Sequence, residues 1–101
     1  MALHGEYKSP GGKLVVVDLN VEGGRLSKVE VSGDFFLEPP EALADIVSAL
    51  EGAAADSEEE GLAKLIRDGL REGAELIGFD PESVAVAVRR AVTDGSPRER
   101  A

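Results

Sequence analysis

Two lysines flank a glycine-rich turn near the start of the sequence, and their spacing suits contact with an anion. Lys8 and Lys13 enclose the segment Ser9-Pro10-Gly11-Gly12. Glycines let backbone N–H groups approach a ligand, and a lysine ammonium is a compact charge that suits phosphate or carboxylate. The segment lacks the spacing of a Walker loop, and no helix is expected directly after it. Two interpretations stay open: a plain turn between strands, or a ligand or partner contact made by Lys8, Gly11, Gly12 and Lys13.

A second candidate segment, Ser32-Gly33-Asp34-Phe35-Phe36-Leu37, holds two of the four aromatic residues of the chain. Adjacent side chains on an extended backbone face opposite sides, so one phenylalanine can enter the core while the other stays outside. The outer ring would be free to anchor a partner surface, or it would pack beneath the first helix. We expect one ring to be buried and the other exposed. The candidate partner interface is therefore Asp34, Phe35 and Phe36.

Catalytic and metal chemistry find little support in the sequence. There is no cysteine, which excludes disulfides, a thiol nucleophile and ligation of an iron–sulfur cluster. The single histidine, His4, is expected to be an ordinary strand residue, because nothing in the sequence pairs it with a nucleophile. The run Glu58-Glu59-Glu60 fits the first turn of a helix better than a metal site. We predict no catalytic residue and no metal site in this chain.

Size and charge limit the partners further. The 101 residues suffice for one domain, and the net charge of −9 argues against binding a nucleic-acid backbone. The segment 38–66 carries one lysine against eight acids, a balance of −7, which indicates either a partner with a basic face or well-solvated helices. No apolar run has the length of a membrane span, and the start does not resemble a signal peptide. We expect a cytoplasmic protein with no nucleic-acid or membrane partner.

Alternation of apolar and polar residues predicts two strands in the first third of the chain, one on each side of Gly23-Gly24. The opening stretch Leu3–Lys8 is expected to be a third strand, joined to them through the turn Ser9-Pro10-Gly11-Gly12. A two-residue Gly-Gly turn would pair Val21 with Leu26 and set the apolar side of one strand against the polar side of the other. A three-residue turn, Glu22-Gly23-Gly24, is therefore expected. It predicts three cross-strand pairs, namely Val15 with Val31, Val17 with Val29, and Asp18 with Lys28.

Helical spacing of apolar residues begins after Pro39-Pro40 and predicts three helices. The first ends at Gly52. The second begins at Ser57, where Glu60 completes a capping-box pattern, and its stripe of Leu62, Leu65, Ile66 and Leu70 ends near Gly73. The third begins at Asp80-Pro81 and ends near Asp94-Gly95. Strands followed by helices predict an α+β domain over residues 1–95, with about three helices on one face of a small three-stranded antiparallel sheet. Residues 96–101 are expected to form a flexible tail.

Two motifs in order resemble a known family. The segments Glu6-Tyr7-Lys8-Ser9-Pro10-Gly11-Gly12-Lys13-Leu14-Val15 and Ser32-Gly33-Asp34-Phe35-Phe36 are similar to the accessory, or C-terminal, domain of lipoate–protein ligases in its free-standing form. The later Leu76-Ile77-Gly78-Phe79-Asp80-Pro81-Glu82 resembles the family's approach to its last helix. The resemblance spans His4 to Val92 and implies a fold related to iron–sulfur scaffold proteins, although the absence of cysteine excludes cluster assembly.

The resemblance also implies a function. Lipoate ligases join lipoate to AMP and then transfer the lipoyl group to a lysine of a carrier domain. A large catalytic subunit would bind lipoate, ATP and Mg²⁺, and this chain would bind no cofactor alone. The chain is then a non-catalytic accessory subunit that docks on the large subunit, is needed to form lipoyl-AMP, and meets the lipoyl carrier domain only indirectly.

Three other interpretations stay open. A general protein-interaction adaptor unrelated to lipoate would share the composition and fold. A fragment of a fused ligase would share the motifs. An independent small enzyme is the weakest alternative, because no nucleophile–base pair is apparent.

Overall fold

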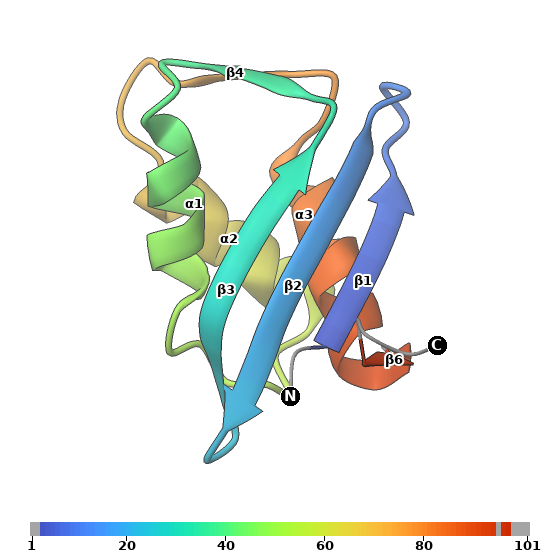
Figure 1. The fold of residues 1–101 in the computed structure, drawn as a ribbon. Coiled ribbons are helices and arrows are strands. Elements are labelled where there is room, and N and C mark those ends of the chain that lie inside the picture. Colours follow the sequence, from blue (N-terminus) through green and yellow to red (C-terminus); the bar gives the residue numbers. More distant parts are fainter. Residues whose placement is uncertain (1–2, 95, 98–101) are drawn as a thin grey trace.

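The computed structural model describes residues 3–94 and 96–97, and its centre is an antiparallel sheet (Figure 1). The strands β1 (Leu3–Lys8), β2 (Leu14–Glu22) and β3 (Arg25–Gly33) lie in the order β3-β2-β1. A two-residue strand, β6 (Ser96–Pro97), pairs with the start of β1. The three predicted strands are confirmed. The first two residues of the predicted tail are paired with the sheet, and residues 98–101 lie outside the described part of the chain.

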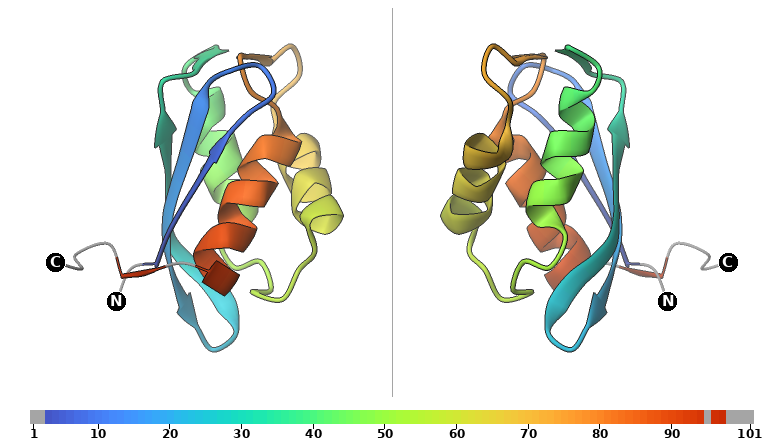
Figure 2. Two further views of the ribbon diagram at one scale, coloured as in Figure 1. Left: turned by 90° about the vertical axis from the view of Figure 1, so that its right-hand side faces the viewer. Right: turned by 90° about the vertical axis from the view of Figure 1, so that its left-hand side faces the viewer.

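Three helices cover one face of this sheet: α1 (Ala42–Leu50), α2 (Glu59–Gly69) and α3 (Pro81–Arg89). α3 continues as a π-helical turn over Arg90–Asp94. Figure 2 shows the sheet edge-on with all the helices on the same side. The predicted α+β architecture is therefore confirmed. The core lies between the two layers and includes Val15, Val17, Leu19, Leu26, Ile46, Leu50, Leu62, Ile66, Val84 and Val88.

The turn between β2 and β3 differs from the predicted one. Val21 pairs with Leu26, so Gly23 and Gly24 form a two-residue turn. Both glycines have positive φ, +60° and +78°, as the type I′ hairpin turn requires. The prediction of a three-residue turn was wrong.

A β-bulge removes the mismatch that the two-residue turn creates. Leu19 lies opposite two residues, Lys28 and Val29, because the register shifts between Asp18 and Asn20. Lys28 has a φ of +50°, and the extra residue turns Val29 and Val31 back toward the core. Beyond the bulge the pairs are Val15–Gly33, Val17–Val31 and Asp18–Glu30, in place of Val15–Val31, Val17–Val29 and Asp18–Lys28.

The predicted start of α3 is confirmed, and that of α2 is wrong. The Asp80 carboxylate accepts hydrogen bonds from the Ser83 backbone N–H at 2.8 Å and from the Ser83 hydroxyl at 2.6 Å. α2 begins two residues after Ser57, and its N-cap, Glu58, makes no side-chain capping bond. Within the predicted apolar stripe of α2, Leu65 is 41% exposed. The Ser57–Glu60 pattern therefore does not form a capping box.

A second, two-stranded sheet closes one end of the molecule and was not predicted. It pairs β4 (Phe36–Glu38) with β5 (Glu75–Ile77) antiparallel. Leu37 and Leu76 face each other and pack partly buried against the core. Because each strand has three residues, neither shows an alternation long enough to be recognised in the sequence.

Candidate functional site

The three segments singled out in the sequence meet at one end of the molecule, where the β1–β2 turn, β4 and β5 lie (Figure 1). The Leu14 backbone N–H donates to the Asp34 carboxylate at 2.7 Å. The Ser9 hydroxyl donates to the Gly78 carbonyl at 2.5 Å. Phe35 stacks on Phe79, with ring centroids 4.0 Å apart and planes 23° from parallel. Side-chain contacts thus hold segments distant in sequence in one arrangement.

The glycine-rich turn is built by its own hydrogen bonds. The Gly12 N–H donates to the Ser9 carbonyl at 2.8 Å, and the Lys13 N–H donates to the Ser9 hydroxyl at 3.3 Å. These two N–H groups are therefore engaged within the turn. A Cβ on Gly11 would lie 2.7 Å from the Gly78 carbonyl oxygen, so glycine at 11 permits the close approach of two backbones. The lysine side chains are what this turn offers to a ligand or partner.

The two lysines differ in how firmly they are held. The aliphatic stem of Lys13 lies against the backbone of Gly78, where a Cβ would overlap its Cγ. Lys13 is half-buried and Lys8 is exposed. Neither forms an ion pair with a residue in the described part of the chain. The turn therefore presents two uncompensated ammonium groups, of which that of Lys13 is the better positioned.

The two adjacent phenylalanines differ in exposure in the expected direction, but neither is fully buried. Phe35 is half-buried and packs against the core, whereas Phe36 is 64% exposed. Asp34 is exposed, yet its carboxylate is occupied by the Leu14 N–H. Of the three predicted interface residues, Asp34 and Phe35 shape the site from within, and Phe36 offers free apolar area to a partner. Its role in an interface stays a prediction.

Sequence reasoning missed three residues of this end. Ile77 is 46% exposed and pairs directly with Phe36 across the β4–β5 ribbon. Glu38 and Glu75 form the next outward-facing pair. The only signal was that Ile77 lies in the third segment of the family resemblance, because nothing local shows that residues 36–38 and 75–77 pair.

His4 lies away from this end, on the sheet face opposite the helices. Its Nδ1 is 2.7 Å from an Asp18 carboxylate oxygen, and its Nε2 is 2.7 Å from a Glu6 carboxylate oxygen. The hydrogen bonds with Glu6 and then Asp18 raise the pKa of His4, because both favour the charged imidazolium. Among the described residues, no serine, threonine or lysine is hydrogen-bonded to it, so His4 is placed as an ion-pairing residue of the sheet.

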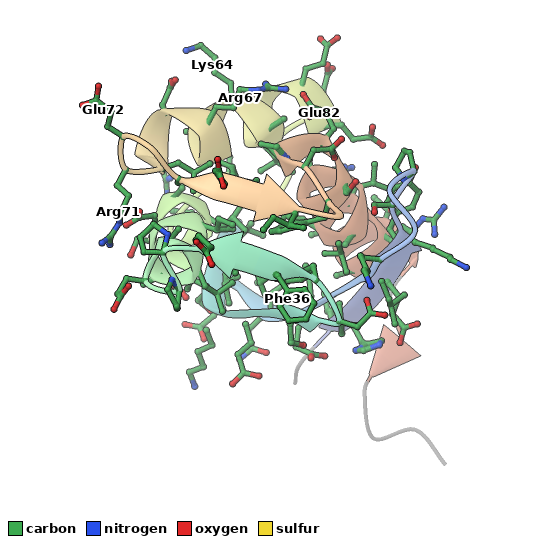
Figure 3. The ribbon with its side chains drawn as sticks, turned by 90° about the horizontal axis from the view of Figure 1, so that it is seen from above. Phe36, Lys64, Arg67, Arg71, Glu72 and Glu82 are labelled. Atoms are coloured by element: carbon green, nitrogen blue, oxygen red, sulfur yellow. The ribbon has the colours of Figure 1, made fainter. Side chains whose placement is uncertain are left out.

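Several basic residues on the helices are paired within the chain. Arg67 of α2 meets Glu82 of α3, and both are seen from above in Figure 3. Lys64 pairs with Asp68 at 2.8 Å. The described residues bring together no group of three or more histidine, aspartate or glutamate side chains that could hold a metal ion. No helix among them is long and apolar enough to cross a membrane.

Arg71, which follows α2, pairs with Asp45 of α1 at 2.7 Å. Their hydrogen bonds lower the pKa of Asp45 and raise that of Arg71. Arg71 is thus paired with α1 and forms no ion pair with the described residues of the β4–β5 ribbon.

Comparisons with known proteins agree on one family. No family model matches the chain. The chain is 33% identical over 76 residues to lipoate-protein ligase A subunit 2 of Thermoplasma acidophilum, covering 75% of this chain and 77% of the relative. A chain in the solved structure of an archaeal lipoylation system, a bi-partite lipoate protein ligase and its E2 lipoyl domain from the same organism, superposes with a TM-score of 0.72. That match has 28% identity over 88% of this chain and 96% of the other. The chain belongs to the family of lipoate–protein ligase A subunit 2.

Proposed function

We propose that this chain is the accessory subunit of a two-component lipoate–protein ligase. The observation that carries the proposal is the similarity to subunit 2 of the Thermoplasma acidophilum ligase, which extends over three-quarters of both chains. The large subunit binds lipoate, ATP and Mg²⁺ and carries out the chemistry. This chain docks on it and is needed to form lipoyl-AMP. The complex works in the cytoplasm.

The end that carries the β1–β2 turn is the part of the chain that we assign to this task. Its elements are fixed to one another by the Asp34–Leu14 and Ser9–Gly78 hydrogen bonds and by the Phe35–Phe79 stack. A surface that is already ordered loses little conformational entropy on docking. Lys13 and Lys8 supply positive charge to a phosphate or a partner carboxylate, with Gly11 and Gly12 shaping their turn, and Phe36 supplies apolar contact. The lipoyl carrier domain contacts the large subunit, and so meets this chain only indirectly.

The alternative is an adaptor with no connection to lipoate. Both interpretations predict a protein partner, but they differ in its identity. A gene for a catalytic lipoate ligase beside the gene for this chain favours the first. A partner without ligase activity favours the second.

The test is co-purification of this chain with a candidate large subunit, followed by lipoate-dependent release of pyrophosphate from ATP. We expect each subunit alone to be inactive in this assay and the mixture to be active. Transfer from preformed lipoyl-AMP to a carrier domain should proceed with the large subunit alone. Failure to form a complex, or activation of lipoate by the large subunit regardless of this chain, would contradict the proposal.

A further inference from the structure

The outward side of the β4–β5 ribbon combines exposed apolar area with concentrated negative charge. We call the residues Phe36, Ile77, Glu38 and Glu75 the ribbon face. Phe36 pairs with Ile77, and Glu38 pairs with Glu75, while Leu37 and Leu76 face the core between them. Phe36 and Ile77 are the two most exposed large apolar side chains in the described part of the chain. Figure 3 looks onto the ribbon from above and shows Phe36 on β4.

The two glutamates bring like charges to directly opposite positions of the ribbon. Like charges directly opposite each other on a sheet repel. No basic side chain of residues 3–94 or 96–97 forms an ion pair with either, and the nearby Arg71 is engaged by Asp45. An external cation placed between the two carboxylates would relieve this repulsion. The ribbon face therefore favours a partner with a lysine or arginine at that position.

The ribbon is held in place before any partner arrives. Its inner side packs on the core through Leu37 and Leu76. Directly after β5, the Gly78 carbonyl accepts a hydrogen bond from the Ser9 hydroxyl at 2.5 Å. Directly before β4, Phe35 stacks on Phe79. The ribbon face thus belongs to the same rigid end as Lys13.

We propose that the ribbon face is the surface that docks on the catalytic subunit, with Phe36 and Ile77 in an apolar depression of the partner and a partner lysine or arginine between Glu38 and Glu75. This rests on the proposed function, because it names the part of this chain that the large subunit contacts. A buried aromatic anchor beside a charge pair is typical of the residues that dominate binding energy. The acidic pair also increases the rate of association with a basic partner and makes binding depend on salt.

A second copy of this chain is a poorer occupant of the same face. Two ribbon faces brought together would place four glutamates in one interface, and each subunit carries a net charge of −9. Such a contact leaves buried carboxylates without cations, which is costly. Self-association through this face is therefore disfavoured.

The experiment measures the affinity of variants for the large subunit by calorimetry or surface plasmon resonance. Phe36→Thr and Ile77→Thr keep strand propensity while removing apolar area, and Glu75→Lys reverses one charge of the pair. Matched controls lie at the opposite end of the molecule, on β2: Val21→Thr, at a side chain that is 39% exposed, and Glu22→Lys. Thermal unfolding and circular dichroism check that every variant is folded.

We expect each ribbon-face variant to weaken binding by about ten- to thirtyfold, and the two controls to change it by less than about twofold. Wild-type binding should weaken with added salt, and Glu75→Lys should reduce that salt dependence while Glu22→Lys leaves it unchanged.

If the wild type binds and activates the large subunit but ribbon-face variants behave like the controls, the inference is wrong and the proposed function stands. If the wild type does not bind, both are overturned. A wild-type homodimer in sedimentation that Phe36→Thr dissociates, with affinity for the large subunit unchanged, would assign the face to a second copy and also overturn the inference.

Discussion

The Asp34 carboxylate accepts a hydrogen bond from the Leu14 backbone N–H at 2.7 Å, and this bond ties the end of β3 to the start of β2. The two residues come from the two motifs that are separated by a full hairpin. Gly33 is part of the same contact, because a Cβ there would overlap the Leu14 carbonyl oxygen. The relationship explains why an aspartate preceded by glycine stands before the two phenylalanines.

Removing this acceptor should loosen the end of the sheet. Asp34→Ala is expected to lower the free energy of unfolding by about 1 kcal/mol, because a hydrogen bond with a charged acceptor is lost at an exposed site where water replaces part of it. Asp34→Asn keeps an acceptor oxygen and should retain most of the stability. Urea denaturation of the three proteins measures the difference. Equal stability of the alanine and asparagine variants would show that the bond contributes nothing.

Alanine substitutions at two glycines, Gly78 and Gly73, test whether the contact of Lys13 with Gly78 matters. Gly78 and Gly73 both have positive φ, +88° and +83°, so alanine at either position carries a similar backbone strain of about 1–2 kcal/mol. A Cβ at 78 would in addition displace the Lys13 stem, whereas a Cβ at 73 meets nothing within 4 Å.

We therefore expect Gly78→Ala to lower both stability and lipoate activation more than Gly73→Ala, with an extra loss of stability of about 1–3 kcal/mol. Chemical denaturation and pyrophosphate release are the two measurements. Identical behaviour of the two variants would mean that the lysine moves aside without consequence.

The elements that the sequence predicted well are those set by local signals. The period-2 pattern of β2 and the helical spacing of α1 need no knowledge of distant residues. The start of α3 was predictable because Asp80, Pro81 and Ser83 lie within one turn of each other, and the cap is made among them.

What the sequence missed depends on pairing between distant segments. The choice between a two- and a three-residue turn was decided by a bulge at Lys28, and no local feature of the strand marks a lysine that adopts a φ of +50°. The β4–β5 ribbon joins residues 36–38 to residues 75–77, so Ile77, Glu38 and Glu75 could not be recognised as neighbours of Phe36. The tertiary contacts that hold the site also join segments that are distant in the sequence, so no local pattern reveals them.

The two predicted helix caps offer a direct comparison. Asp80→Ala should lower the free energy of unfolding by about 1–2 kcal/mol, because it removes the acceptor of both the Ser83 N–H and the Ser83 hydroxyl, and Ser83 is 1% exposed. Ser57→Ala should change it by less than about 0.5 kcal/mol, because Ser57 makes no cap in this structure. Thermal and urea unfolding of both variants provide the measurement. If Ser57→Ala lowered the free energy of unfolding as much as Asp80→Ala, Ser57 would cap α2 after all, contrary to the structure.

His4 should make stability depend on pH. Its pKa in the folded state lies above the ordinary value of 6.5, so the charged imidazolium between Glu6 and Asp18 stabilises the fold. For a raised pKa, this contribution is fully present below about pH 6.5 and is lost as the pH rises through the folded-state pKa. The melting temperature should fall by a few degrees between about pH 6 and pH 8.5.

His4→Gln is the matched variant, since it removes the titrating group while its amide can still reach one carboxylate. Its melting temperature should be nearly constant over the same range. A wild-type curve parallel to that of His4→Gln would show that the ion pairs on this strand do not contribute.

The last prediction concerns Lys13 and separates its charge from its packing. Lys13→Met keeps the stem that lies on Gly78 but removes the ammonium, and Lys13→Arg keeps a positive charge. If the ammonium contacts a phosphate or a partner carboxylate in a partly desolvated site, its loss costs about 1.5–3 kcal/mol, or about ten- to a hundredfold in the rate of lipoyl-AMP formation. Transfer from preformed lipoyl-AMP should be unchanged, because that step does not need the activation geometry.

Lys64→Ala is the control, since the Lys64–Asp68 pair is an exposed surface contact of little energetic value. Circular dichroism confirms folding, and the two steps are assayed separately. A rate of adenylation in Lys13→Met equal to that of the wild type would make Lys13 a turn residue only, and the subunit would then act through its other contacts.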